Sequence, residues 1–167
     1  MNLIVDAGNT QIKWAIFCDG EIREQGVSVS WEELLKASWV SSMADLKACM
    51  LSSTRKIGAQ VKSFMHNSDV TFHILDHKMK LPIKLGYETP ETLGLDRIAG
   101  VAGARARFPD TNVLVIDLGT AITYDLLLEN GCFLGGNISP GLEIRFKGLD
   151  RFTDNLTVLA FIQFPFF

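Results

Sequence analysis

The sequence predicts an α/β fold of two related domains, the second of which is incomplete. The first reason is a pattern that occurs at residues 4–13 and again at 115–125: an apolar, β-branched run ends in aspartate, and a glycine follows two positions later. The two aspartates, Asp6 and Asp117, lie 111 residues apart, enough for a small domain. The second reason is that apolar runs alternate with segments of helical periodicity between the copies. An internal repeat on this scale indicates a duplicated unit.

The first copy of the pattern opens three strands, after which helices and strands alternate. Asp19 and Gly20 form a dipeptide typical of a two-residue hairpin, which would join the second and third strands. Ser30 precedes Trp31 and is a suitable helix N-cap. The predicted elements are strands at 2–7, 12–18 and 21–29, a helix from Trp31, a strand at 46–52, a helix capped by Ser53 that ends near residue 66, and a strand at 70–75.

The second copy repeats this order but has fewer residues after it. We expect a boundary near residue 80, with one domain at 1–80 and a partial second domain at 81–167. The predicted elements are a helix that starts near Pro90 and continues from Leu93 to Phe108, strands at 113–118, 121–128 and 131–138, and a helix from Leu142 to Leu149. After residue 154 the sequence is apolar and Phe-rich without amphipathic period, which is typical of a truncated or frameshifted product. Half a domain would leave apolar faces of its sheet and helix uncovered.

The bulk properties of the chain exclude several classes of protein. Of its 167 residues, 47% are hydrophobic and 21% charged, which is typical of folded rather than disordered chains. The net charge of −3 offers no electrostatic case for binding nucleic acid or an anionic membrane. No apolar run is long enough to span a bilayer, and the opening residues lack the features of a signal peptide. The three cysteines follow no metal-ligand spacing, so we expect buried, reduced thiols in a cytoplasmic protein.

The two Asp-x-Gly turns are candidate phosphate-binding elements. Backbone N–H groups of a glycine-bearing turn can approach phosphate oxygens closely, and an aspartate at a strand end can hold the cation that neutralises them. Thr10 and Thr120 add hydroxyl groups, and Lys13 adds a positive charge near the first turn. The alternative is that both are ordinary hairpin turns. Their duplication in matching context favours one ligand bound between two similar domains.

The segment Gly94-Leu95-Asp96-Arg97 is a candidate acid–base element near the start of a predicted helix. In the functional interpretation, Asp96 accepts a proton from a substrate hydroxyl and Arg97 holds an anionic part of the substrate. The alternative is a solvent-exposed Asp96–Arg97 pair on the helix surface, which would contribute little. Phosphoryl transfer needs positioning, charge neutralisation and one base, which these elements together could provide.

In combination, these motifs resemble those of the type III pantothenate kinases, which belong to the acetate kinase/actin/Hsp70 superfamily. The resemblance covers residues 1 to about 153 and implies duplicated ribonuclease H-like (actin-like ATPase) domains. Four motifs carry it, in the family's order: Asp6-x-Gly8-Asn9-Thr10-x-x-Lys13, Gly94-x-Asp96-Arg97, Asp117-x-Gly119-Thr120-Ala121-x-Thr123-x-Asp125 and Gly135-Gly136-x-Ile138-x-Pro140-Gly141. The Phe-rich ending resembles no element of the family.

The resemblance implies ATP-dependent phosphorylation of pantothenate to 4′-phosphopantothenate, the first step towards coenzyme A, by a cytoplasmic homodimer. It implies that ATP is bound by Asp6, Gly8, Asn9, Thr10, Lys13, Gly119 and Thr120, and that Asp6 also binds the Mg²⁺ that accompanies ATP. It implies that Asp117 holds K⁺ or NH₄⁺ and that Asp96 is the general base. The pantothenate pocket would be lined by Tyr87, Gly94, Leu95, Asp96 and Arg97. Family members extend well past residue 154, so we expect impaired activity. Two alternatives stay open: a kinase for another small hydroxyl substrate, and a non-catalytic nucleotide-binding regulator of the Bvg accessory factor type.

Overall fold

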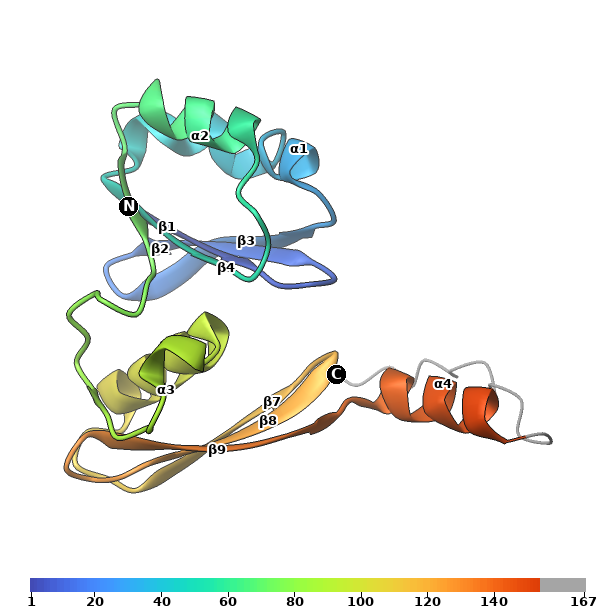
Figure 1. Ribbon diagram of the computed structural model, residues 1–167. Helices are drawn as coiled ribbons and strands as arrows, with labels where there is room; N and C mark the ends of the chain where they lie inside the picture. Colours follow the sequence, from blue (N-terminus) through green and yellow to red (C-terminus); the bar gives the residue numbers. More distant parts are fainter. Residues whose placement is uncertain (154–167) are drawn as a thin grey trace.

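The computed structural model describes residues 1–153, which form two mixed β-sheets with helices packed on them (Figure 1). The expectations for the Phe-rich ending concern residues that lie outside this described range. Among the described residues, no helix is long and apolar enough to cross a membrane.

The first sheet has the strand order β3-β2-β1-β4-β5, in which β4 and β5 run parallel to β1 and the first three strands form an antiparallel meander. Its strands are β1 (Asn2–Ala7), β2 (Ile12–Cys18), β3 (Glu21–Ser28), β4 (Ala48–Ser53) and β5 (Thr71–Ile74). All five predicted strands are therefore confirmed, with ends that differ by at most two residues. The predicted Asp19-Gly20 hairpin is also confirmed, since both residues have the positive φ that this turn needs, 52° and 86°.

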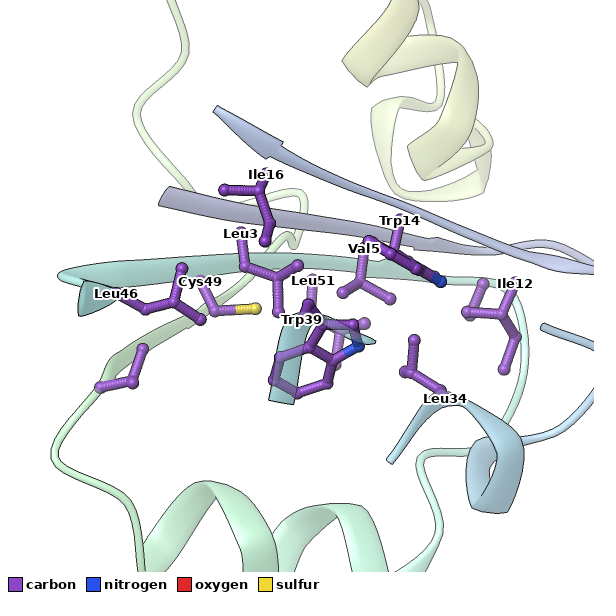
Figure 2. Packing of buried hydrophobic residues seen from close by; sticks show 12 residues of the cluster. Leu3, Val5, Ile12, Trp14, Ile16, Leu34, Trp39, Leu46, Cys49 and Leu51 are labelled. Atoms are coloured by element: carbon purple, nitrogen blue, oxygen red, sulfur yellow. The ribbon is translucent and has the colours of Figure 1, made fainter. Parts of the chain in front are cut away.

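The first core lies between this sheet and the helices α1 (Trp31–Leu34), η1 (Ser38–Asp45) and α2 (Ala59–His66). Alternate residues of β1 point into it, which is why Leu3 and Val5 are buried (Figure 2). Ser30 caps α1 as predicted, because its Oγ accepts a hydrogen bond of 3.2 Å from the Glu33 amide. The helix is only four residues long, and the short 3₁₀ helix η1 then carries Trp39 into the core (Figure 2).

The prediction that Ser53 caps the next helix is wrong. Ser53 ends β4, and α2 begins only at Ala59. The Ser53 hydroxyl donates to the Arg55 carbonyl at 2.8 Å and accepts from the Arg55 amide at 3.1 Å. This local turn uses the side chain that a cap would need. It also directs the Arg55 side chain towards the turn that follows β1.

The second sheet has the order β6-β9-β8-β7 and packs one face against α3. Its strands are β6 (Lys84–Leu85), β7 (Val113–Leu118), β8 (Ala121–Leu127) and β9 (Cys132–Pro140). The helices η2 (Pro90–Thr92) and α3 (Leu95–Arg107) lie between β6 and β7 in sequence. The predicted meander is confirmed, although β9 extends two residues further. The continuous helix from Pro90 is wrong: Pro90 starts a separate 3₁₀ turn and α3 begins at Leu95. The short strand β6, parallel to β9, was not predicted.

The opposite face of the second sheet is exposed and apolar. Leu114, Ile116 and Leu118 of β7 are 51–75% exposed, and Ile138 of β9 is 57% exposed. The following helix α4 (Leu142–Phe152) has no buried residue within the described part of the chain. Among residues 1–153, the apolar faces of the second sheet and of α4 are thus uncovered, as expected. The division of the chain at residue 80 stays a prediction, although one buried cluster draws on residues up to 72 and the other on residues from 81 onward.

The three cysteines are free thiols, but only one of them is buried as expected. Cys49 lies in the first core, where burial raises the pKa of its thiol to about 12. This makes it a packing residue rather than a reactive one. Cys18 and Cys132 are half-buried.

Candidate functional site

The structure brings the two duplicated turns into direct contact. Gly8, Asn9 and Thr10 follow β1, and Gly119 and Thr120 follow β7. The hydroxyl oxygens of Thr10 and Thr120 lie 3.1 Å apart and share a hydrogen bond. Hydroxyl-bearing residues of the two turns therefore face each other, as expected if one ligand is held between them.

Backbone contacts to Gly141 hold the second turn in place. The Gly119 amide donates to the Ala121 carbonyl at 3.0 Å, and the Gly141 amide donates to the Thr120 carbonyl at 3.0 Å. A Cβ atom at position 141 would overlap the carbonyl oxygens of Gly119 and Thr120. Glycine is required at position 141 because the backbone at the start of α4 approaches the turn this closely.

Three carboxylates and one lysine gather beside these turns. Asp6 is half-buried near the end of β1, and Lys13 lies directly opposite it on the neighbouring antiparallel strand β2. Burial raises the pKa of Asp6 above its ordinary value, and the nearby charges of Asp96 and Asp117 raise it further, while Ser52 and Lys13 lower it. The structure thus places the predicted residues Lys13, Asp96 and Asp117 within electrostatic reach of Asp6.

Asp6 has an oxygen suited to a cation. Its Oδ1 is buried and has no hydrogen-bond partner among residues 1–153, because the Ser52 hydroxyl, although near enough to lower the pKa of Asp6, does not meet hydrogen-bond geometry. An unsatisfied buried carboxylate oxygen is costly unless a ligand uses it. Within the same residues, no three His, Cys, Asp or Glu side chains are arranged to hold a metal ion by themselves. A cation here would therefore need further oxygen atoms from water or from phosphate.

This raised pKa makes the stability of the Asp6→Asn variant dependent on pH. Because folding raises the pKa of Asp6 above 3.8, the contribution of this carboxyl to stability is complete below that pH and is lost as the pH rises through the folded-state value. We expect the variant to melt a few degrees above the wild type at pH 7 and to show no gain at acid pH. Thermal unfolding at a series of pH values measures this difference. The exposed Asp69→Asn is the control, and a lower melting temperature of Asp6→Asn at pH 7 would contradict the prediction.

Asp96 lies in the first turn of α3, where the helix dipole favours a negative charge. Its side chain is exposed, and its Oδ1 accepts a hydrogen bond of 2.9 Å from the Arg97 amide. A Cβ atom at position 94 would overlap the Asp96 carboxylate. Because Gly94 has no side chain, the Asp96 carboxylate can occupy this position at the start of α3.

Arg97 is buried and pairs with Asp125 of β8. Its Nε lies 2.9 Å from Oδ1 and 3.2 Å from Oδ2 of Asp125, and its Nη2 lies 2.5 Å from Oδ1. The side chains are only 8% and 1% exposed. The alternative of a solvent-exposed Asp96–Arg97 pair is therefore wrong, and only Nη1 of Arg97 is left without a bond to Asp125.

Asp125 is a site residue to which sequence reasoning assigned no role. The available signal was its position between Thr123 and Leu127, on the alternating inward face of a strand. An aspartate at such a position needs a charged or hydrogen-bonding partner, because burying an unpaired carboxylate is costly. Arg97, 28 residues earlier, is that partner.

The structure places Tyr87 and Leu95 with the second core. Both are half-buried and pack against its buried cluster. The ring of Tyr87 lies directly on Gly135, where a Cβ atom would overlap it and where φ is +87°. These two predicted pocket residues thus border the second sheet.

The sequence matches the family described as Type III pantothenate kinase over residues 2–163, which extends beyond the motif region ending near residue 153. Type III pantothenate kinases from Christiangramia forsetii and Phocaeicola vulgatus are 42% and 39% identical to it. The alignments cover 96% and 93% of this chain but 66% and 64% of those proteins. The chain therefore spans about two thirds of the length of these relatives.

Two solved structures resemble the fold. A Campylobacter jejuni chain described as a Baf family transcriptional activator has a TM-score of 0.54 at 22% identity, covering 91% of this chain and 61% of that one. A Sinorhizobium meliloti chain described as a 2-dehydro-3-deoxygalactonokinase has a TM-score of 0.52 at 14% identity, covering 92% and 58%. At these identities the likeness concerns the fold alone, and it supports the predicted α/β class with two actin-like units. Since the family match extends over nearly the whole sequence, this chain belongs to the type III pantothenate kinase family.

Proposed function

We propose that this chain uses ATP to phosphorylate pantothenate to 4′-phosphopantothenate. The observation that carries the proposal is the convergence of Asp6, Asp96, Asp117 and Lys13 on the two threonine-bearing turns. The residues proposed to bind ATP are Asp6, Gly8, Asn9, Thr10, Lys13, Gly119 and Thr120. Their hydroxyl and amide donors and the lysine suit the phosphates of a nucleotide.

Cations belong to the same proposal. The unsatisfied Oδ1 of Asp6 fits a Mg²⁺ ion that would complete its coordination with phosphate oxygens, and Asp117 would hold K⁺ or NH₄⁺. When bound, these cations neutralise the charge on the transferring phosphoryl group. The chain's own part is to keep the two turns in the orientation in which both can contact the same triphosphate.

In the proposed reaction, Asp96 is the catalytic base. The pantothenate hydroxyl oxygen bonds to the γ-phosphorus, the bond from that phosphorus to the β–γ bridging oxygen breaks, and ADP leaves. Asp96 accepts the hydroxyl proton, which its exposed position and its amide-oriented carboxylate favour. Tyr87, Gly94, Leu95 and Arg97 would line the pantothenate pocket, with Nη1 of Arg97 as the nitrogen left for the substrate.

A second candidate function is nucleotide binding without turnover, as in a regulator of the Bvg accessory factor type. The observation that favours it is the apolar outer face of the second sheet, uncovered in residues 1–153. A kinase for another small hydroxyl substrate is the third candidate. Homodimer formation and a cytoplasmic location are part of the main proposal.

The deciding experiment measures ATP-dependent phosphorylation of pantothenate with and without K⁺. We expect turnover that requires the cation and that is lost when pantothenate is replaced by acetate or a sugar. Turnover with one of those substrates instead would favour the other kinase. Absence of turnover combined with protection by Mg-ATP against thermal unfolding would favour the nucleotide-binding regulator. Absence of both would overturn the proposal.

A further inference from the structure

We propose that Arg55 is a positioning residue for the first phosphate-binding turn. This inference rests on the proposed function, because it assigns Arg55 to the ATP site formed by Gly8, Asn9 and Thr10. Arg55 follows β4 and is half-buried. It lies outside the four motifs that identify the family.

The guanidinium group of Arg55 binds the turn on the side of its carbonyl oxygens. Its Nε donates to the Gly8 carbonyl, its Nη2 donates to the Asn9 carbonyl at 2.9 Å, and its Nη1 donates to the Val29 carbonyl at 3.2 Å. Three nitrogens of one rigid planar group thus hold three backbone oxygens, two of them in the turn. A lysine could not reproduce this fork, because its ammonium is a single point.

These bonds determine where the amide groups of the turn point. In a trans peptide unit, the C=O and the following N–H lie in one plane and point in opposite directions. Because the Gly8 and Asn9 carbonyls are directed at Arg55, the Asn9 and Thr10 amides are directed away from it. Neither amide has a hydrogen-bond partner among residues 1–153. Two successive free N–H groups are a suitable binding element for a phosphate oxygen.

The two duplicated turns are therefore held by different means. Backbone contacts to Gly141 hold the second turn, whereas two side chains that follow β4 hold the first. Arg55 binds the Gly8 and Asn9 carbonyls, and the Thr54 hydroxyl donates to Oδ1 of Asn9 at 3.4 Å. Arg55 lies 47 residues from Gly8 in sequence, so the geometry of the first turn depends on a non-local contact. It can be removed without changing any residue proposed to touch ATP.

The test compares Arg55→Ala and Arg55→Lys with the matched control Arg105→Ala. Arg105 also donates to a backbone carbonyl, that of Glu129 at 2.9 Å, but at the far hairpin of the second sheet. Isothermal titration with Mg-ATP measures the dissociation constant. We expect it to rise about tenfold or more in Arg55→Ala, to rise less in Arg55→Lys, and to stay at the wild-type value in Arg105→Ala. Added guanidinium ion should partly restore binding to Arg55→Ala, and the KM for pantothenate should not change.

Each outcome distinguishes the inference from the function it rests on. A wild-type chain that does not bind Mg-ATP overturns the proposed function and with it this role. Wild-type binding with an unchanged dissociation constant in Arg55→Ala overturns the role of Arg55 alone. If Arg55→Ala is unfolded at the assay temperature, Arg55→Lys decides. Folded Arg55→Lys with weakened ATP binding supports the positioning role, and wild-type affinity overturns it.

Discussion

The Asp96→Asn variant is expected to lose about 10²- to 10⁴-fold in the rate of pantothenate phosphorylation, because this is the contribution typical of one positioned general base. Asparagine has the same shape as aspartate and can still accept the hydrogen bond from the Arg97 amide to Oδ1. It cannot take the proton from the substrate hydroxyl. The start of α3 should therefore keep its structure while the chemical step slows.

Initial rates at saturating Mg-ATP and pantothenate measure this loss, and a titration with Mg-ATP shows whether binding is retained. The same substitution at Asp19, an exposed residue of the first hairpin, is the matched control and should leave the rate unchanged. A rate in Asp96→Asn within twofold of the wild type would exclude Asp96 as the base. Loss of Mg-ATP binding together with activity would instead give Asp96 a role in the nucleotide site.

Removal of either partner of the Arg97–Asp125 pair is expected to lower the free energy of unfolding by about 3–5 kcal/mol. The reason is burial: the two side chains are 8% and 1% exposed, so Arg97→Ala or Asp125→Ala leaves an uncompensated charge in the interior. The pair also connects the start of α3 to β8, so both variants should lose activity as well. Denaturant unfolding at neutral pH measures the stability change.

The matched control is the Glu32–Lys36 pair, whose side chains are 71% and 73% exposed. Its removal should change the free energy of unfolding only slightly, as is typical of solvent-exposed ion pairs. The double variant Arg97→Met/Asp125→Leu should recover much of the loss of each single variant, because no charge is left buried. Single variants as stable as the wild type would show that the pair is open to water in solution.

Local sequence signals predicted the strands of both meanders well. Alternating burial along β1, β2 and β8 repeats every two residues, and the Asp19-Gly20 turn needs only its own positive φ angles. The predictions that failed concern positions with competing options. Ser53 could cap a helix or form a local turn, and Pro90 could begin α3 or a separate 3₁₀ turn. In each case a few hydrogen bonds between neighbouring residues determined which of the two structures formed.

The candidate site was predicted in part. Its motif residues were found from sequence, and four of them, Asp6, Lys13, Asp96 and Asp117, gather in the structure. The partner of Arg97 was not found, because the adjacent Asp96 was the nearest carboxylate in sequence. Arg55 was not found either, because no local pattern indicates that a side chain will bind a turn formed much earlier in the chain.

The sequence by itself determined the α/β class, the duplicated Asp-x-Gly turns and the family, because strand periodicity, turn residues and motif spacing are local properties. Only the tertiary structure decided that Thr10 contacts Thr120, that Arg97 pairs with Asp125, and that Arg55 holds the first turn. These contacts join residues 110, 28 and 46 positions apart. They form because sheet pairing and core burial bring distant elements together, and the side chains then pair with whichever charged or polar group lies nearest.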